Sequence, residues 1–127
     1  QDFYVSEDAA REAVRSRRMF NAIHLDTGFK IDLVVMRSRP FSSEELRRRE
    51  LGSLAGRQVA FATAEDTILT KLEWAKMGDS DRQYEDAGSV MRVQEARLDW
   101  SYLEHWGDEL DLRDLLERAR HGKPFRS

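Results

Sequence analysis

The stretch of sequence that decides the fold is MFNAIHLDTGFKIDLVVM, residues 19–36. Two runs rich in residues that favour strands, 19–26 and 29–36, are joined by Thr27 and Gly28. A two-residue connection that contains glycine is typical of a β-hairpin, because glycine accepts the positive φ that tight turns require. The stretch therefore predicts two antiparallel strands at the centre of a sheet.

Counting outward from this turn predicts the partners and the faces of the two strands. His24 lies opposite Ile31, and Ile23 lies opposite Asp32. Since side chains alternate between faces, Asp32 and Lys30 share one face and His24 lies on the other. The second strand is otherwise apolar, which predicts an interior strand covered on both sides. His24 is best interpreted as a half-buried histidine with a hydrogen-bond partner.

Shorter signals place the other elements around this hairpin. The second half of the chain is predicted to be helical, because apolar residues recur there at helical spacing and follow residues that favour helix N-termini. The expected elements are an edge strand at 3–5, a helix from 7 to about 17, a helix at 44–51, a strand at 57–62, and helices that begin near Thr63, Asp81, Asp99 and Asp111.

These elements predict an α+β fold. A small mixed β-sheet with the hairpin at its centre is expected within 1–62, with helices packed on it. A helical part follows at 63–120, and 121–127 is expected to be a frayed tail. A chain of 127 residues suits a single domain, 1–127, and is long enough for one hydrophobic core.

Composition excludes several classes of function. The chain carries 24 acidic and 21 basic side chains, a net charge of −3, so charge gives no reason to expect nucleic acid or an acidic membrane as a partner. Cysteine is absent, which excludes disulfides and thiolate chemistry and fits a cytoplasmic protein. No apolar run reaches the roughly 20 residues that span a bilayer, and the first residues are unlike a signal peptide.

Asp32 is the candidate for chemistry that the pattern itself singles out. It is an acid in the middle of an otherwise apolar strand, and an unpaired buried carboxylate is costly. Such an acid is usually bound to a metal, placed at a catalytic cleft or paired with a cation. Two interpretations stay open: a metal or catalytic carboxylate at the sheet surface, or a salt bridge with Lys30 or an arginine.

Lys71 and Asp86 form a second candidate pair. Lys71 lies at the boundary of the apolar stripe of its helix, and Asp86 lies on the polar side of the next helix. They could contact a phosphate and anchor it, or they could be a solvated surface pair. The basic run 47–49 is diluted by neighbouring glutamates, so an exposed helix of mixed charge is the safer interpretation.

Four stretches resemble, in their order and spacing, segments of the nucleotidyltransferase superfamily in its minimal and abortive-infection toxin-like bacterial branches. FNAIHLDTGFKIDL (20–33) is similar to the second catalytic strand, and AEDTILTKLEW (64–74) is similar to the helix that follows it. RQYED (82–86) and LDWSYL (98–103) continue the match. The resemblance covers most of the chain, from about Phe3 to Arg120.

In such proteins three carboxylates surround magnesium. Two come from a Gly-Ser loop followed by an Asp-x-Asp strand, and the third comes from a later strand. The resemblance implies that Asp32 is the third acid, both catalytic and metal-binding, that Lys71 contacts a nucleoside triphosphate, and that Asp86 assists it. Metal ions that bridge the phosphates need such acids to hold them. The complete reaction would transfer a nucleoside monophosphate to a hydroxyl group of a protein, RNA or small molecule.

The sequence departs from this pattern before Asp32, where neither the Gly-Ser loop nor the Asp-x-Asp strand is found. Asp26 does not replace them, because it lies on the opposite face of the hairpin. The first hypothesis is a truncated nucleotidyltransferase-like protein that is catalytically incomplete and binds Mg²⁺ and nucleotide weakly. The alternative is a non-catalytic module that binds a second copy of itself, or a missing N-terminal segment, through an uncovered sheet edge.

Overall fold

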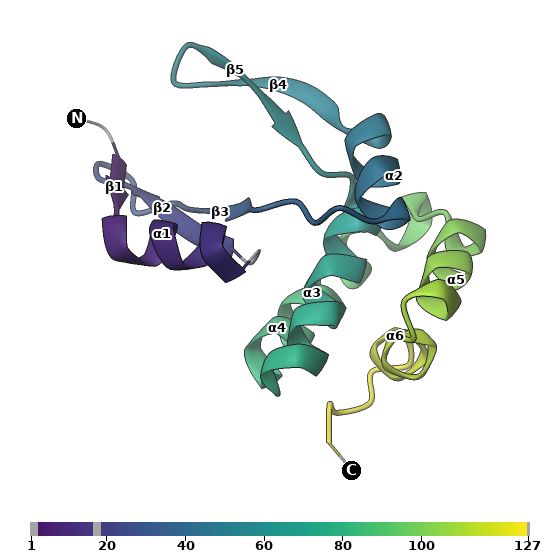
Figure 1. Ribbon diagram of the computed structural model, residues 1–127. Helices are drawn as coiled ribbons and strands as arrows, with labels where there is room; N and C mark the ends of the chain where they lie inside the picture. Colours follow the sequence, from purple (N-terminus) through teal and green to yellow (C-terminus); the bar gives the residue numbers. More distant parts are fainter. Residues whose placement is uncertain (1–2, 17–18, 127) are drawn as a thin grey trace. The chain divides into compact units, whose positions relative to one another are not determined.

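The computed structural model describes residues 3–16 and 19–126 of the chain (Figure 1). It confirms the α+β fold class and the helical C-terminal half. The chain divides into two compact units, Gln1–Ser43 and Glu44–Ser127. The expectation that the chain forms a single domain stays a prediction. Across 3–16 and 19–126, no helix combines the length and apolar character needed to cross a bilayer.

The first unit holds a three-stranded antiparallel sheet in the order β1-β2-β3. Its helix ends, within the described residues, at Ser16, and Arg17, expected near the helix end, lies outside them. Ala13 on the helix and Ala22 on the middle strand are both buried. The elements of this unit are β1 (Phe3–Val5), α1 (Glu7–Ser16), β2 (Met19–His24) and β3 (Lys30–Val34).

The hairpin between β2 and β3 has a longer loop than expected. His24 N donates to Phe29 O at 2.8 Å, so the loop comprises the four residues 25–28 and not Thr27-Gly28 alone. Asn21 therefore pairs with Asp32, a register two residues away from the predicted one. Because the shift is even, every side chain keeps its predicted face. The wider loop is held by His24, whose Nδ1 lies 2.8 Å from Thr27 Oγ1.

Strand β3 is an edge strand, which corrects the prediction that it is covered on both sides. Among the described strands of this sheet, only β2 pairs with it. Leu33 and Val34 are 40% and 44% exposed. The apolar run predicted a strand between two neighbours, but a run of residues carries no information about how many strands the sheet contains.

Helix α2 (Pro40–Arg48) runs across the division between the units and begins four residues before the predicted helix at 44–51. Proline suits the first position of a helix because its missing N–H has no partner there anyway. The helix is followed by a hairpin of β4 (Glu50–Leu54) and β5 (Arg57–Phe61). Strand β5 confirms the strand predicted at 57–62, whereas β4 was not expected. Both described sheets are thus antiparallel, and the single mixed sheet expected from the sequence is divided in two.

The helical part of the second unit is built around α3 (Ala64–Gly78). The cap predicted at Thr63 is present, since its Oγ1 accepts a hydrogen bond from Asp66 N at 3.2 Å. Leu72 is fully buried, as are Leu103 and Leu116 on helices that pack against α3. The helices that follow are α4 (Asp81–Gln94), the 3₁₀ turn η1 (Glu95–Arg97), α5 (Trp100–Glu109) and α6 (Arg113–Arg120).

Two predictions near the C-terminus are wrong. Asp111 does not cap the last helix, because it adopts a left-handed φ of 57° and its carboxylate accepts from Lys76 Nζ at 2.9 Å. The segment 121–126 is not frayed. The Phe125 ring stacks on Tyr84 with centroids 5.2 Å apart, and Arg126 contacts aspartates at the start of α4. Phe125 and Arg126 thus hold the segment in place through contacts with residues far away in the sequence. Composition of the tail alone does not indicate such contacts.

The close approach of α5 and α6 gives a first test of this packing. A Cβ added at Gly107 would lie 3.2 Å from Leu116 Cδ2, and Leu116 is fully buried, so a shift of its side chain disturbs packed neighbours. Gly107→Leu is expected to lower the free energy of unfolding by about 1–3 kcal/mol through overpacking. Gly78→Leu is the matched control, because nothing lies within 4 Å of its Cβ position. Urea denaturation followed by circular dichroism checks both; equal losses would contradict the prediction.

Candidate functional site

The structure places Asp32 in the middle of β3, half-buried on the open-edged strand of the first unit. It takes part in an interaction within the structure. Lys30 lies on the same face of the strand but is exposed. Both interpretations of Asp32, a metal or catalytic carboxylate and a salt bridge with Lys30 or an arginine, stay predictions.

The structure brings Lys71 and Asp86 together. Lys71 Nζ on α3 lies 3.5 Å from Asp86 Oδ2 on α4, and 3.4 Å from Gln83 Oε1 one turn earlier. The lysine side chain is mostly buried and the Asp86 side chain is half-exposed. Lys71 also has a further interaction within the structure. The pair predicted from the sequence is present.

The predicted residues are divided between the two units of the chain. Asp32 belongs to the first unit, whereas Lys71 and Asp86 belong to the second. In the described ranges, no three side chains of His, Cys, Asp or Glu are grouped so that they could hold a metal ion. The three carboxylates that the resemblance implies are not assembled by these residues.

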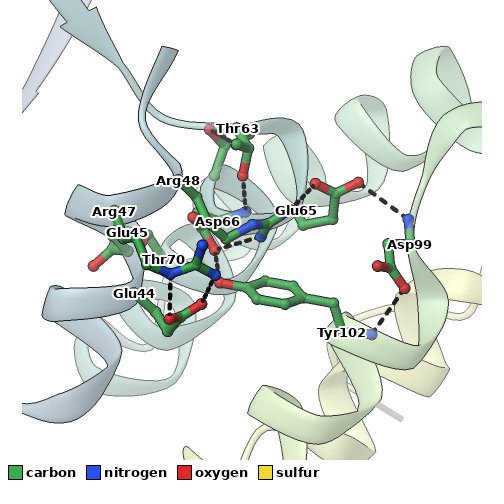
Figure 2. A network of polar contacts seen from close by, with 11 residues as sticks. Glu44, Glu45, Arg47, Arg48, Thr63, Glu65, Asp66, Thr70, Asp99 and Tyr102 are labelled. Carbon is green, nitrogen blue, oxygen red and sulfur yellow. Dashed lines mark hydrogen bonds and ion pairs between the residues drawn. The ribbon is translucent and has the colours of Figure 1, made fainter.

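The most strongly connected polar cluster of the second unit was not expected from the sequence (Figure 2). Arg48, at the end of α2, donates to Glu65 Oε1 at 3.0 Å and to Asp66 Oδ1 at 3.3 Å at the start of α3. The Arg48 guanidinium also lies 3.6 Å from the centroid of the Tyr102 ring on α5. We call these four residues, Arg48, Glu65, Asp66 and Tyr102, the buried polar cluster.

Asp66 is the innermost member of the buried polar cluster, with none of its surface exposed. Its Oδ1 accepts a hydrogen bond from Tyr102 Oη at 2.5 Å, whereas its Oδ2 has no hydrogen-bond partner among the described residues. Burial raises the pKa of Asp66, and the Tyr102 hydroxyl and the Arg48 charge oppose that rise only in part. Burial and the hydrogen bond to Asp66 also raise the pKa of Tyr102.

The geometry of the buried polar cluster suits positioning more than chemistry. Glu65 adds a hydrogen bond from Asp99 N at 3.1 Å, so the cluster ties α2 and the N-terminus of α3 to the start of α5. The Thr63-x-x-Asp66 pattern was interpreted as a local helix cap. A pair of adjacent acids two and three residues after that cap, ahead of an apolar stripe, is the signal that could have indicated a buried role for them.

A pocket of about 400 Å³ lies between α4 and the C-terminal segment 121–126. Tyr84 and Phe125 contribute aromatic rings, and Glu85 and Arg92 contribute charges of both signs. The volume falls in the range of small-molecule sites. None of the three residues predicted from the sequence lines this pocket.

Comparison with known proteins identifies no relative. No family model, no curated protein and no solved structure matches the chain. The resemblance to nucleotidyltransferases, and the roles that it implies for Asp32, Lys71 and Asp86, therefore stay predictions.

Proposed function

We propose that this chain is a nucleotidyltransferase-like protein that is catalytically incomplete by itself and retains part of a nucleotide site. The observation that supports the proposal most directly is the meeting of Lys71 and Asp86 across α3 and α4. The resemblance assigns these two residues to the nucleotide, and they are 15 positions apart in the sequence. Their contact gives that assignment a physical basis.

In this proposal the Lys71 ammonium contacts phosphate oxygens of a nucleoside triphosphate. Asp86 and Gln83 hold the ammonium at the surface of the helix pair when no nucleotide is bound. An ion pair at 3.5 Å with a half-exposed carboxylate is loose, so an incoming phosphate can displace the carboxylate at modest cost. Lys71 has a further interaction within the structure, and a phosphate would bind beside it or displace it as well.

Magnesium does not fit the described residues by themselves. Asp32 could supply one oxygen ligand, but Mg²⁺ demands near-octahedral coordination and is normally held by more than one acid or by acids together with phosphates. The described part of the chain assembles no group of three acids around it. We therefore derive no transfer step for this chain, and Asp32 would act only when further carboxylates join it.

The test is a titration with ATP and with GTP, each with and without Mg²⁺, followed by thermal shift and calorimetry. A ligand at ten times its Kd stabilises a protein by about 1.4 kcal/mol, which raises Tm by several degrees in a small domain. Lys71→Met is expected to remove most of the shift. Lys76→Met is the matched control, since it lies on the same helix but pairs with Asp111.

Magnesium dependence is read separately with Asp32→Asn. A Mg²⁺-dependent part of the shift that disappears in this variant would show that Asp32 holds the ion together with nucleotide phosphates, which supply the ligands that the described acids do not. That part of the shift should persist in Asp26→Asn, which changes an exposed acid in the adjoining loop. If millimolar nucleotide produces no shift in the unmodified chain, the proposal of a nucleotide site fails.

A second candidate function is a non-catalytic interaction module, and the open edge of β3 favours it. Leu33 and Val34 stay 40% and 44% exposed although they lie on a strand with an apolar sequence. An exposed, apolar edge strand is a template for a further strand, and proteins usually cover or charge such an edge. Binding by strand addition would give hydrogen-bond partners to the backbone groups of the edge and would bury its apolar side chains.

A further inference from the structure

We propose that two copies of this chain pair through the open edges of their β3 strands, antiparallel and centred on Ile31. The inference rests on the second candidate function and names the occupant of the edge. Pairing of this kind extends the three-stranded sheet of each copy into one continuous sheet of six strands across a two-fold axis.

The backbone of β3 shows which residues present groups to the open edge. Phe29 O accepts from His24 N, so the Phe29 carbonyl is directed toward β2. In an antiparallel ladder, successive residues direct their N–H and C=O groups alternately to one neighbour and to the other. The N–H and C=O groups of Ile31 are therefore directed toward β2. Those of Lys30 and Asp32 are directed toward the open edge.

A two-fold pairing must place outward-directed residues opposite each other, which leaves few registers. Centred on Ile31, Lys30 lies opposite Asp32 of the second copy, and Asp32 lies opposite Lys30 of the second copy. In a register centred on Asp32 or on Lys30, like charges lie directly opposite each other, which is destabilising. In a register centred on Leu33, neither Lys30 nor Asp32 lies opposite a residue of the other charge. Charge complementarity thus selects the register at Ile31.

The same register also pairs apolar side chains on the other face of the strand. Phe29, 72% exposed, lies opposite Leu33 of the second copy. Lys30 is exposed, so its charge lies at the surface of the strand. Asp32 already has an interaction of its own, and the two oxygens of a carboxylate can accept from a second donor as well.

Disulfide trapping tests the register. The chain has no cysteine, so Ile31→Cys introduces a single thiol. Residues opposite each other in a non-hydrogen-bonded antiparallel pair have Cα atoms about 4.5 Å apart, within the range that a disulfide bridges. Leu33→Cys is the control. In the register centred on Ile31, position 33 of one copy is offset from position 33 of the other by four residues, about 13 Å along the strand.

We expect Ile31→Cys to oxidise to a covalent dimer at least tenfold faster than Leu33→Cys. Equal rates, or faster cross-linking of Leu33→Cys, would overturn the register.

Charge variants give a test that needs no core substitution. Lys30→Glu is expected to weaken dimerisation at least tenfold in analytical ultracentrifugation, and the double variant Lys30→Glu/Asp32→Lys is expected to restore it. Lys123→Glu makes the same charge change at an exposed site of the second unit and should leave dimerisation unaltered.

Amide exchange separates failure of this inference from failure of the functions proposed above. The amides of Lys30 and Asp32 should exchange rapidly at high dilution and become protected as concentration rises. A monomer with rapid exchange at every concentration would overturn the second copy as occupant and leave the edge open to another partner. A monomer with slow exchange would show that the edge is covered within the chain. That result would overturn both this inference and the second candidate function. The nucleotide titration is independent of either result.

Discussion

Arg48→Met is expected to lower the free energy of unfolding by about 3–5 kcal/mol, the cost of leaving buried charges without their cation. Arg48 is the cation that contacts both Glu65 and Asp66, at 3.0 and 3.3 Å. Asp66 is fully buried, and its Oδ2 already has no hydrogen-bond partner among the described residues. Methionine fills a similar volume, so the loss measures charge and hydrogen bonding more than packing.

Arg47→Met is the matched control one residue earlier. Arg47 also pairs with a glutamate, Glu44, at 2.7 Å, but its side chain is exposed. Exposed pairs contribute about 0–1 kcal/mol, so this variant should stay close to the unmodified chain. Urea denaturation at neutral pH measures both variants. A loss for Arg48→Met that does not exceed the loss for Arg47→Met would show that solvent reaches the buried polar cluster.

Arg48→Lys refines the same test, because lysine keeps the charge and loses the planar fork that serves two carboxylates at once. Its loss is expected to fall between those of the other two variants. If it equals the loss for Arg48→Met, geometry and not charge holds the cluster. The Arg48 guanidinium also lies over the Tyr102 ring at 3.6 Å, a contact that an ammonium reproduces less well.

The fold class was predictable because its signals are local. Thr63 and Asp99 each accept a hydrogen bond from the backbone three residues later, as the residue types at those positions indicated. The hairpin at 19–36 was likewise readable from alternation and from Gly28, whose φ is 75°. Such features depend on neighbours in the chain and need no knowledge of the tertiary structure.

The errors arose where tertiary neighbours decide. The β4–β5 hairpin turns at Ala55 and Gly56, both with positive φ, and alanine is not a residue that signals such a turn. The register of β2 and β3 follows from a four-residue loop in which the His24 ring contacts Thr27, a side-chain contact that the residue pattern does not reveal although it is local. The edge position of β3 depends on the number of strands in the sheet, which no stretch of residues encodes.

The candidate site shows the same division. Lys71 and Asp86 were predicted as a pair because Lys71 lies at the boundary of an apolar stripe and Asp86 lies on the polar side of the next helix, and their side chains do meet. The buried polar cluster joins Arg48 to Asp66 and Tyr102, which are 18 and 54 positions away in the sequence. Each of these residues resembles ordinary surface or capping chemistry until the helices meet, so the sequence alone could not identify the cluster.

Leu72→Ala carries the second large expected effect, a loss of about 2–5 kcal/mol in the free energy of unfolding. Leu72 is fully buried on α3 and is adjacent in sequence to Lys71. Helix α3 packs against α4, α5 and α6, so a cavity at Leu72 removes contacts inside the helical core. Thermal denaturation measures the loss, and a decrease of Tm by well over 5 °C is expected in a domain of this size.

Val93→Ala is the control for Leu72→Ala. Val93 lies on α4 in the same unit but is 80% exposed, so truncation of its side chain leaves no cavity. Alanine has the higher helix propensity, and this variant should be neutral or slightly stabilised. A loss below about 1 kcal/mol for Leu72→Ala would mean that the neighbouring helices collapse into the vacated space. Because such a collapse would move α3 against α4, the 3.5 Å contact between Lys71 and Asp86 would change with it. The nucleotide-dependent shift would then fall even in a variant whose stability is preserved.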